Sequence, residues 1–305
     1  MRLPFELPPP RGSSLAPTWD GRSFACGETR TAVLEYSENL EGWSDALTDL
    51  HEEAVGDSHP IDIASRNDAL AQVRNLRPAA GAVILEIGCS SGFLLRELVS
   101  SFPEAVVLGA DVVKKPLQRL AKTLPGVPLM RFDLLQCPLP EGSIDVLLML
   151  NVLEHIEDDA SALRKAFALL KPGGALILEV PAGPALYDAY DAELRHFRRY
   201  ASSELEEKLT GAGFRIARRS HLGFLLFPAF ALTKWLGRRG SPGQSTSVVG
   251  ARAGRTAGST LVRWALELEA RYVSGIRLPF GIRVLAVGIK GEPPAPAKGR
   301  ACEHS

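Results

Sequence analysis

The chain alternates between short, continuous apolar runs and segments in which apolar residues recur at helical spacing. Residues 82–87 form such a run, and after a turn that contains Gly88 and Gly92 the apolar residues return with a helical period. This pattern predicts a buried strand, a tight loop and a helix. Further strands are predicted at residues 105–110, 128–132, 143–150, 175–180, 214–221 and 282–290, and helices at 115–123 and 202–209. Such alternation is typical of an α/β fold with a parallel sheet.

The two ends of the chain depart from this alternation. Residues 1–23 are rich in proline and residues 293–305 in proline and alanine, so both are predicted to be disordered. Residues 24–76 are polar with apolar positions at amphipathic spacing between Trp43 and His51, and a second helix is expected to begin near Pro60. We expect residues 24–76 to form a helical cap on a core domain of residues 77–222.

About sixty residues separate the last two predicted strands, and this interval, residues 223–276, is interpreted as an insertion before the final core strand at 277–292. Residues 222–236 are almost wholly apolar, residues 237–258 are rich in Gly, Ser and Arg and are expected to be flexible, and residues 259–274 return to an amphipathic helix. The apolar run of about fifteen residues is shorter than the roughly 20 that span a bilayer. It fits a membrane-interface contact, a lid over a lipophilic substrate, or a buried hairpin.

Composition narrows the class of protein. The chain has 305 residues, 23% of them charged and 46% hydrophobic, which fits one α/β domain with additions. The formal net charge is zero, but no acidic residue lies between Glu207 and Glu267, where many arginines lie, so an anionic neighbour is expected there. The four cysteines are widely separated and without a C-x-x-C pair, which predicts reduced thiols, a cytoplasmic location and no metal site.

The loop after the first core strand indicates a nucleotide-like cofactor. Glycines let the backbone approach a ligand, and the helix that follows presents unpaired N–H groups. A dinucleotide fingerprint, G-x-G-x-x-G, would need glycine where this chain has Ser90 and Phe93. The sequence therefore argues against a dinucleotide.

The stretch from Glu86 to Gly92 resembles motif I of the class I S-adenosylmethionine-dependent methyltransferases, (E/D)-x-G-x-G-x-G, with Ser90 in place of the middle glycine. Asp111 ends the second strand, the segment RFDLL contains Asp133, and SIDVLLMLNVLEHI and LKPGG follow in the order of that family's later motifs. The resemblance implies a Rossmann-like, doubly wound seven-stranded sheet in the order 3-2-1-4-5-7-6, with the seventh strand antiparallel.

The resemblance also implies the cofactor, S-adenosylmethionine, and its contacts. Glu86 would meet the amino end of the methionine moiety, Asp111 the ribose, and Asp133 the adenine edge. The full set of cofactor-binding residues expected from the resemblance is Glu86, Gly88, Ser90, Gly92, Asp111, Val112, Asp133, Leu134 and Asn151. Both aspartates occur at strand carboxyl ends, where open α/β sheets bind ligands.

Catalysis by methyl transfer needs proximity and a deprotonated acceptor. His155, which follows the fourth strand, is the candidate general base because the unperturbed pKa of a histidine side chain lies near neutral pH, and Glu154 would orient it or act as the base instead. An alternative interpretation is that both residues only brace the loop.

A second polar segment, DAYDAELRHFRRY, follows the fifth strand. It is similar to an element of a bacterial subgroup of these methyltransferases, with a methyltransferase-11 or ubiquinone-biosynthesis-like core and no generally assigned substrate, although Tyr190 replaces the first His of that element. The candidate substrate residues are Tyr190, His196, Arg198, Arg199 and Tyr200. An Arg-Arg-Tyr run is equally consistent with a salt-bridged surface.

The resemblance thus implies an enzyme that methylates a small or lipid-linked molecule, with O-methylation favoured over N-methylation because a His base suits a hydroxyl acceptor. The alternative is a non-catalytic, membrane-associated S-adenosylmethionine-binding protein, in contact with the inner face of the membrane through residues 222–239. Nucleic acid is not an expected partner, since the net charge is zero and no N/D-P-P-Y motif follows the fourth strand.

Overall fold

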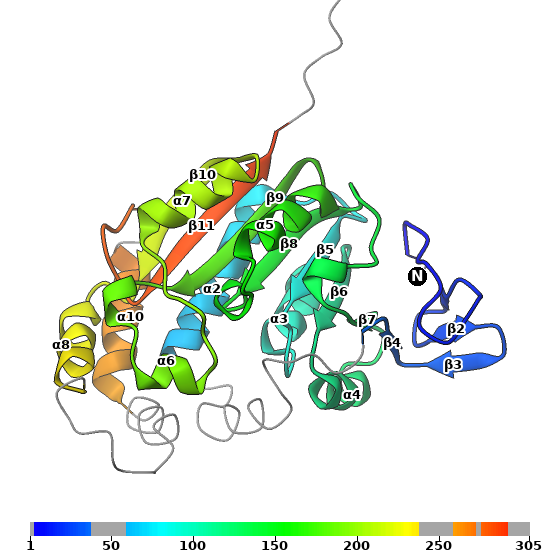
Figure 1. The fold of residues 1–305 in the computed structure, drawn as a ribbon, viewed down its shortest axis with the longest axis horizontal. Coiled ribbons are helices and arrows are strands. Elements are labelled where there is room, and N and C mark those ends of the chain that lie inside the picture. The colour runs from blue at the N-terminus through cyan, green and yellow to red at the C-terminus, as the bar shows by residue number, and fades with distance from the viewer. Residues whose placement is uncertain (1–2, 38–58, 238–258, 273–275, 292–305) are drawn as a thin grey trace, which may run out of the picture.

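The computed structural model describes residues 3–37, 59–237, 259–272 and 276–291. Its largest feature is a sheet of eight strands (Figure 1). The strands are β4 (Val33–Glu35), β5 (Val83–Ile87), β6 (Val106–Asp111), β7 (Leu129–Arg131), β8 (Ile144–Leu150), β9 (Leu170–Pro181), β10 (Phe214–Leu222) and β11 (Arg283–Lys290). Their order is β10-β11-β9-β8-β5-β6-β7-β4.

The strand order confirms the topology expected from the sequence. β5 to β9 run parallel, whereas β11 lies antiparallel between β9 and β10, as the seventh strand of the predicted order should. The predicted count of seven is wrong by one strand, because β4 adds to the edge parallel to β7. The carboxyl ends of β5, β6, β7 and β8 therefore meet at one edge of the sheet.

Helices cover both faces of the sheet. They are α2 (Pro60–Leu76), α3 (Phe93–Ser101), α4 (Lys114–Thr123), α5 (Asp159–Leu169) and α7 (Ser202–Gly211), with a short α6 (Ala189–Glu193). Side chains of β5 alternate between the faces: Leu85 packs in the cluster that contains Leu163 of α5, and Ile84 in the cluster that contains Leu95 of α3. This alternation is what a strand buried on both faces requires. Short 3₁₀ turns, η1 (Leu134–Gln136), η2 (Leu153–His155) and η3 (Pro184–Leu186), lie between the larger elements.

The N-terminal segment differs from its prediction. β1 (Thr18–Trp19), β2 (Phe24–Cys26) and β3 (Thr29–Thr31) form a small antiparallel sheet, so the disorder predicted for residues 1–23 is wrong over the described part. Trp19 and Phe24 are buried, with ring centroids 4.7 Å apart, and their burial anchors the segment. The helix expected from residue 24 is wrong as far as Glu35, where strands occur instead.

Of the remaining residues of the predicted cap, the structure describes those from residue 59 onward. α2 begins at Pro60 as expected, with Pro in its first turn. The amphipathic pattern between Trp43 and His51 lies outside the described residues.

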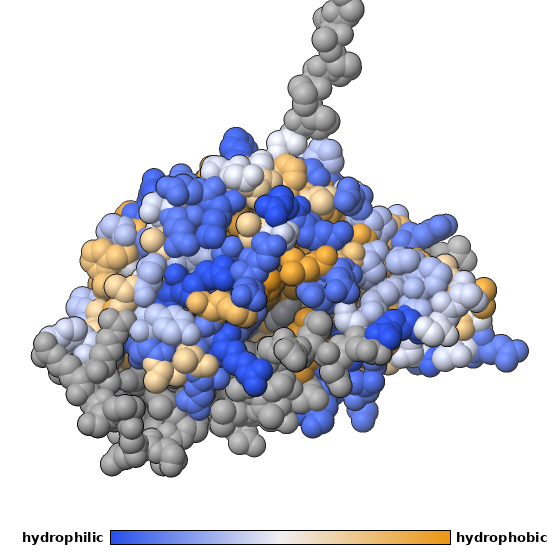
Figure 2. All heavy atoms as spheres, viewed as in Figure 1, coloured by the Kyte–Doolittle hydropathy of each residue, from blue (hydrophilic) through white to orange (hydrophobic). Residues whose placement is uncertain are grey.

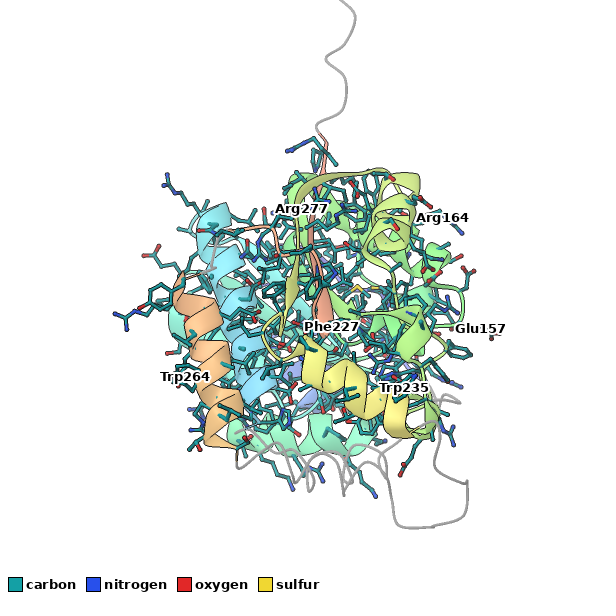
Figure 3. The ribbon with its side chains drawn as sticks, turned by 90° about the vertical axis from the view of Figure 1, so that its left-hand side faces the viewer. Glu157, Arg164, Phe227, Trp235, Trp264 and Arg277 are labelled. Atoms are coloured by element: carbon teal, nitrogen blue, oxygen red, sulfur yellow. The ribbon has the colours of Figure 1, made fainter. Side chains whose placement is uncertain are left out.

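The insertion between β10 and β11 contributes two described helices. α8 (Phe227–Gly237) follows β10, and α10 (Thr260–Tyr272) packs beside α2 at the end of the molecule that Figure 3 shows. Of the residues predicted to be flexible, 237–258, the first ends α8 and the others lie outside the described part of the chain. No described helix has both the length and the apolar character that a bilayer crossing requires.

Candidate functional site

The glycine loop after β5 is shaped by its own packing. Gly88 and Gly92 have φ of 77° and 74°, and Ser90 has φ of 42°, so three residues of the loop adopt left-handed backbone conformations. A Cβ on Gly88 would lie 2.4 Å from Cγ2 of Val152, which follows β8. Glycine at this position is therefore required for the close contact between the loop and the segment that leads into η2.

Asp111, at the carboxyl end of β6, forms a hydrogen bond with the glycine loop. Its Oδ2 accepts a hydrogen bond of 2.7 Å from the backbone N–H of Ser90, and its Oδ1 accepts one of 3.0 Å from Val113. The side chain is buried, and burial raises its pKa although these backbone donors favour the charged form. Asp111 therefore joins two loops at the sheet edge where a ligand would lie.

Glu86 brings a second carboxylate to the same place. It is buried in β5, and its Oε2 has no hydrogen-bond partner among the described residues. Burial raises its pKa well above the ordinary value, and the nearby charge of Asp111 adds to the shift. An uncompensated acidic group of this kind fits a cationic ligand.

The end of β7 carries the predicted adenine-binding residues. Asp133 caps η1 by accepting a 2.9 Å hydrogen bond from Leu135 N–H, and its own N–H donates to Oγ of Ser37 at 3.0 Å. Arg131 donates from Nε to the carbonyl of Val112 at 2.9 Å. Neither Ser37 nor Arg131 was predicted from the sequence. Ser37 lies 96 residues before Asp133, its hydrogen-bond partner, and Arg131 is a residue of strand β7.

Asn151 has φ of 52° at the end of β8. Its Nδ2 donates to Oε1 of Glu179 at 3.1 Å, and Glu179 also accepts from Arg283 at 2.7 Å. Arg283 pairs in turn with Asp62 on α2. This network was not predicted, because its members come from four segments that lie far apart along the chain.

The predicted catalytic residues meet one predicted substrate residue. Glu154, His155 and His196 each offer a possible metal-ligating atom, and these atoms lie within 4.8 Å of one another. The imidazole centroids of His155 and His196 are 4.7 Å apart. Glu154 is 0% exposed, and burial raises its pKa to about 8, an effect that its own backbone N–H and the charge of Arg283 offset only in part. We call these three residues the Glu–His–His cluster.

Asp191 binds His196, one of the three residues of this cluster. It is completely buried and accepts hydrogen bonds from Nδ1 of His196 at 3.0 Å, Nε of Arg199 at 2.8 Å and Nζ of Lys234 at 2.9 Å. Burial alone would raise its pKa, but these donors and the two positive charges hold the pKa well below the usual range. Lys234, on α8, was not predicted from the sequence; it ties the insertion to α6.

The other predicted substrate residues have partners inside the protein. Tyr200 is 0% exposed and donates to Oδ2 of Asp159 at 2.9 Å, and Arg198 pairs with the same carboxylate at 2.8 Å. Arg199 is bound to Asp191, and the ring of Tyr190 lies 5.4 Å from Nζ of Lys234. These contacts match the salt-bridged alternative for the Arg-Arg-Tyr run, and contact with substrate stays a prediction.

Comparison with known proteins shows similarity over part of the chain. Residues 85–178 match the methyltransferase-11 family, described as a methyltransferase domain. A protein of Mycolicibacterium smegmatis named a probable S-adenosylmethionine-dependent methyltransferase is 30% identical over 139 residues, 45% of this chain and 53% of that protein. A trans-aconitate 2-methyltransferase of Methylobacterium nodulans is 33% identical over 114 residues, 37% of this chain and 43% of that protein. The chain thus spans about half the length of the curated relatives it matches.

Solved structures show the same fold. Phosphoethanolamine N-methyltransferase 2 of Haemonchus contortus, in complex with S-adenosyl-L-methionine, has a TM-score of 0.52 and 18% identity over 81% of this chain and 57% of that chain. A chain from the complex of the Trm112 methyltransferase activator of Haloferax volcanii has a TM-score of 0.56 and 18% identity over 83% of this chain and 97% of that chain. Residues 85–178 are therefore similar to a methyltransferase domain, and the chain shares the fold of these solved structures.

Proposed function

We propose that this protein is an S-adenosylmethionine-dependent methyltransferase that acts on a small or lipid-linked molecule. The observation that carries the proposal is the buried Glu86 carboxylate, which has an oxygen without a hydrogen-bond partner beside the glycine loop. A ligand with a cationic amino group compensates such a carboxylate. The match of residues 85–178 to a methyltransferase domain supports S-adenosylmethionine as that ligand.

The residues at the sheet edge fit the cofactor. Each oxygen of Asp111 accepts one backbone N–H and retains a second acceptor site, so the carboxylate can also bind ribose hydroxyls. Asp133 is fixed by η1 and has one oxygen left for the adenine edge. We assign cofactor binding to Glu86, Gly88, Ser90, Gly92, Asp111, Val112, Asp133, Leu134 and Asn151.

S-adenosylmethionine, when bound, supplies a methyl group on a positively charged sulfur. The chain itself must bring the acceptor close and take up its proton. We assign the proton transfer to His155 with Glu154 beside it, and the acceptor side of the pocket to His196 and Tyr190. A histidine base favours a hydroxyl acceptor and therefore O-methylation over N-methylation. Arg198, Arg199 and Tyr200 would act indirectly, by holding the loop that carries His196.

Calorimetric titration with S-adenosylmethionine tests the cofactor assignment. Glu86→Gln removes a charge-assisted hydrogen bond, which is worth about 1.5–3 kcal/mol or roughly 10- to 150-fold in Kd. Glu104→Gln is the matched control, since Glu104 is exposed and precedes β6 at the opposite end of the sheet. Binding that is lost equally in both variants, or absent from the unaltered protein with both S-adenosylmethionine and S-adenosylhomocysteine, contradicts the proposal.

A lipid-linked acceptor is favoured by the surface of the insertion. Leu232 and Trp235 are 55% and 46% exposed and lie three residues apart on α8, and Leu225, in the turn before α8, is 47% exposed. On α10, Leu261 and Trp264 are 70% and 58% exposed. Figure 3 shows these two helices at the same end of the molecule, whereas the face in Figure 2 is mostly hydrophilic with hydrophobic residues gathered near its centre. Exposed apolar and aromatic side chains on helices at one end of a molecule are typical of membrane-interface contact.

Vesicle flotation with anionic lipid tests this finer proposal. We expect the full chain to float with the vesicles and the double variant Leu232→Ser, Trp235→Ser to float less. Leu15→Ser is the control, because Leu15 is 54% exposed in the distant N-terminal segment. Equal flotation of all three proteins, or none, contradicts membrane contact through α8.

A further inference from the structure

The Glu–His–His cluster has the composition of a metal site. Glu154 and His155 belong to η2, directly after β8, and His196 lies in the loop after α6, so two separate segments converge on one point. Donor atoms about 2 Å from a metal ion lie roughly 3–4 Å from one another, so atoms within 4.8 Å need only a small side-chain adjustment to share an ion.

Glu154 is the second, independent observation. Its side chain is 0% exposed, and neither carboxylate oxygen has a hydrogen-bond partner among the described residues. The neighbouring cations are bound elsewhere: Arg199 to Asp191 and the carbonyl of Ala182, and Arg283 to Glu179 and Asp62. A buried carboxylate without a partner is costly, and a coordinated cation removes that cost.

His196 is oriented as metal-binding histidines usually are. Its Nδ1 faces Oδ1 of Asp191 at 3.0 Å, and an Nδ1–H donated there leaves the Nε2 lone pair available as a ligand. Asp191 is itself fixed by Arg199 and by Lys234 on α8. A carboxylate that fixes the tautomer of a ligating histidine is the common outer shell of a protein metal site.

We propose that Glu154, His155 and His196 bind one divalent transition-metal ion, with the remaining coordination positions open to an oxygen of the methyl acceptor. Two imidazoles and one carboxylate suit Zn²⁺, Fe²⁺, Co²⁺ or Mn²⁺ better than Mg²⁺ or Ca²⁺, which prefer oxygen ligands. The expectation of no metal rested on cysteine spacing, and His155 and His196 are too far apart in sequence to form a recognisable motif.

If the proposed function holds, the open coordination position of the ion can bind the methyl acceptor. An acceptor hydroxyl or carboxylate oxygen bound to the ion is oriented, and a bound hydroxyl loses its proton to solvent more readily than a free one. In that arrangement His155 is a ligand, and the ion replaces it in activating the acceptor. The substrate class is then an oxygen acceptor that can coordinate a metal. Binding of the ion itself does not depend on the methyltransferase proposal.

The test uses the full chain after removal of metal with a chelator. Titration with Zn²⁺ by calorimetry, and with Co²⁺ by visible absorption, should show one saturable site per chain. Glu154→Gln keeps the side-chain volume, and His196→Ala removes a ligand; each should weaken binding at least tenfold. Asp191→Asn should weaken binding by about 10- to 100-fold through His196 while one equivalent still binds. His59→Asn is the control and should bind as tightly as the unaltered protein, since His59 precedes α2 and its Nδ1 faces Asp62 at 3.4 Å rather than a residue of the cluster.

The metal site is overturned if no saturable site is found. It is also overturned if Glu154→Gln and His196→Ala, shown by circular dichroism to be folded, bind the ion as tightly as the unaltered protein. If Glu154→Gln does not fold, His155→Ala takes its place in the comparison. S-adenosylmethionine titrated into the same samples separates the two proposals. Cofactor binding without metal binding overturns the inference alone, and metal binding without cofactor binding overturns the proposed function alone.

Discussion

Gly88→Ala probes the contact that joins the glycine loop to the segment after β8. Gly88 has φ of 77°, and a Cβ there would lie 2.4 Å from Cγ2 of Val152. Gly81 is a matched control, because its φ is 76° and a Cβ there would meet nothing within 4 Å. The two substitutions share the cost of a left-handed alanine and differ chiefly in the collision with Val152.

The size of the effect follows from these two contributions. A residue with a Cβ in the left-handed region costs about 1–2 kcal/mol, which is the whole loss expected for Gly81→Ala. Moving Val152 out to an ordinary contact distance of 3.4 Å requires a local displacement, and overpacking of this kind costs about 1–3 kcal/mol. Gly88→Ala should therefore lower the free energy of unfolding by about 2–5 kcal/mol.

Urea unfolding followed by circular dichroism measures both losses. Val152→Ala removes the colliding methyl groups, so the double variant Gly88→Ala, Val152→Ala should be more stable than the sum of the single losses predicts, by about 1 kcal/mol or more. The reasoning is refuted if Gly88→Ala costs no more than Gly81→Ala, or if the Gly88 and Val152 substitutions are additive.

Three further predictions concern groups outside the glycine loop. Burial raises the pKa of Asp159, but hydrogen bonds from Lys208, Arg198 and Tyr200 outweigh it and hold the pKa below the usual value. The ionised Asp159 therefore stabilises the folded state above the unfolded-state pKa of about 3.9, and this stabilisation is lost as the pH falls through the folded-state pKa. In urea unfolding at acid pH, the free energy of unfolding should fall less in Asp159→Asn than in the unaltered protein. Identical pH profiles of the two proteins count against this role of Asp159. Arg283→Met leaves two carboxylates, Asp62 and the 1% exposed Glu179, without a cation and should cost about 3–5 kcal/mol in urea unfolding. Arg218→Met removes the cation of one carboxylate only, in a pair with Asp68 whose side chains are 24% and 20% exposed, and should cost less; equal losses contradict the distinction. Burial raises the pKa of Cys89 well above its ordinary value, so iodoacetamide should alkylate the partly exposed Cys26 first, as read by peptide mass spectrometry, and early labelling of Cys89 contradicts its burial.

The sheet was predictable because its signals are local. Strands β5, β6 and β8 are compact apolar runs, and the spacing of Gly88, Asp111 and Asp133 indicated which strand ends meet. Strand β4 was not predictable in this way. It has three residues, and its contribution is a pairing with β7 about 96 residues further along the chain.

The candidate site was predictable residue by residue but not as an assembly. His155 and His196 were each singled out by their neighbours in sequence, yet nothing local indicates that their rings meet. The same holds for Asp191 and Lys234, which form a buried ion pair across 43 residues. The N-terminal strands were missed for a different reason. Two- and three-residue strands carry too few positions for a period, and burial of Trp19 against Phe24 decides their fold.

The carboxyl ends of β5, β6, β7 and β8 form the proposed cradle for S-adenosylmethionine. Hydrogen–deuterium exchange of the full chain with and without S-adenosylmethionine tests it most directly. We predict that added cofactor slows exchange in peptides that contain Ser90, Val113 and Leu135, whose amides bond to Asp111 and Asp133, and leaves β10 unchanged. Unaltered exchange in all three peptides at saturating cofactor, or protection confined to other parts of the chain, would contradict the claim.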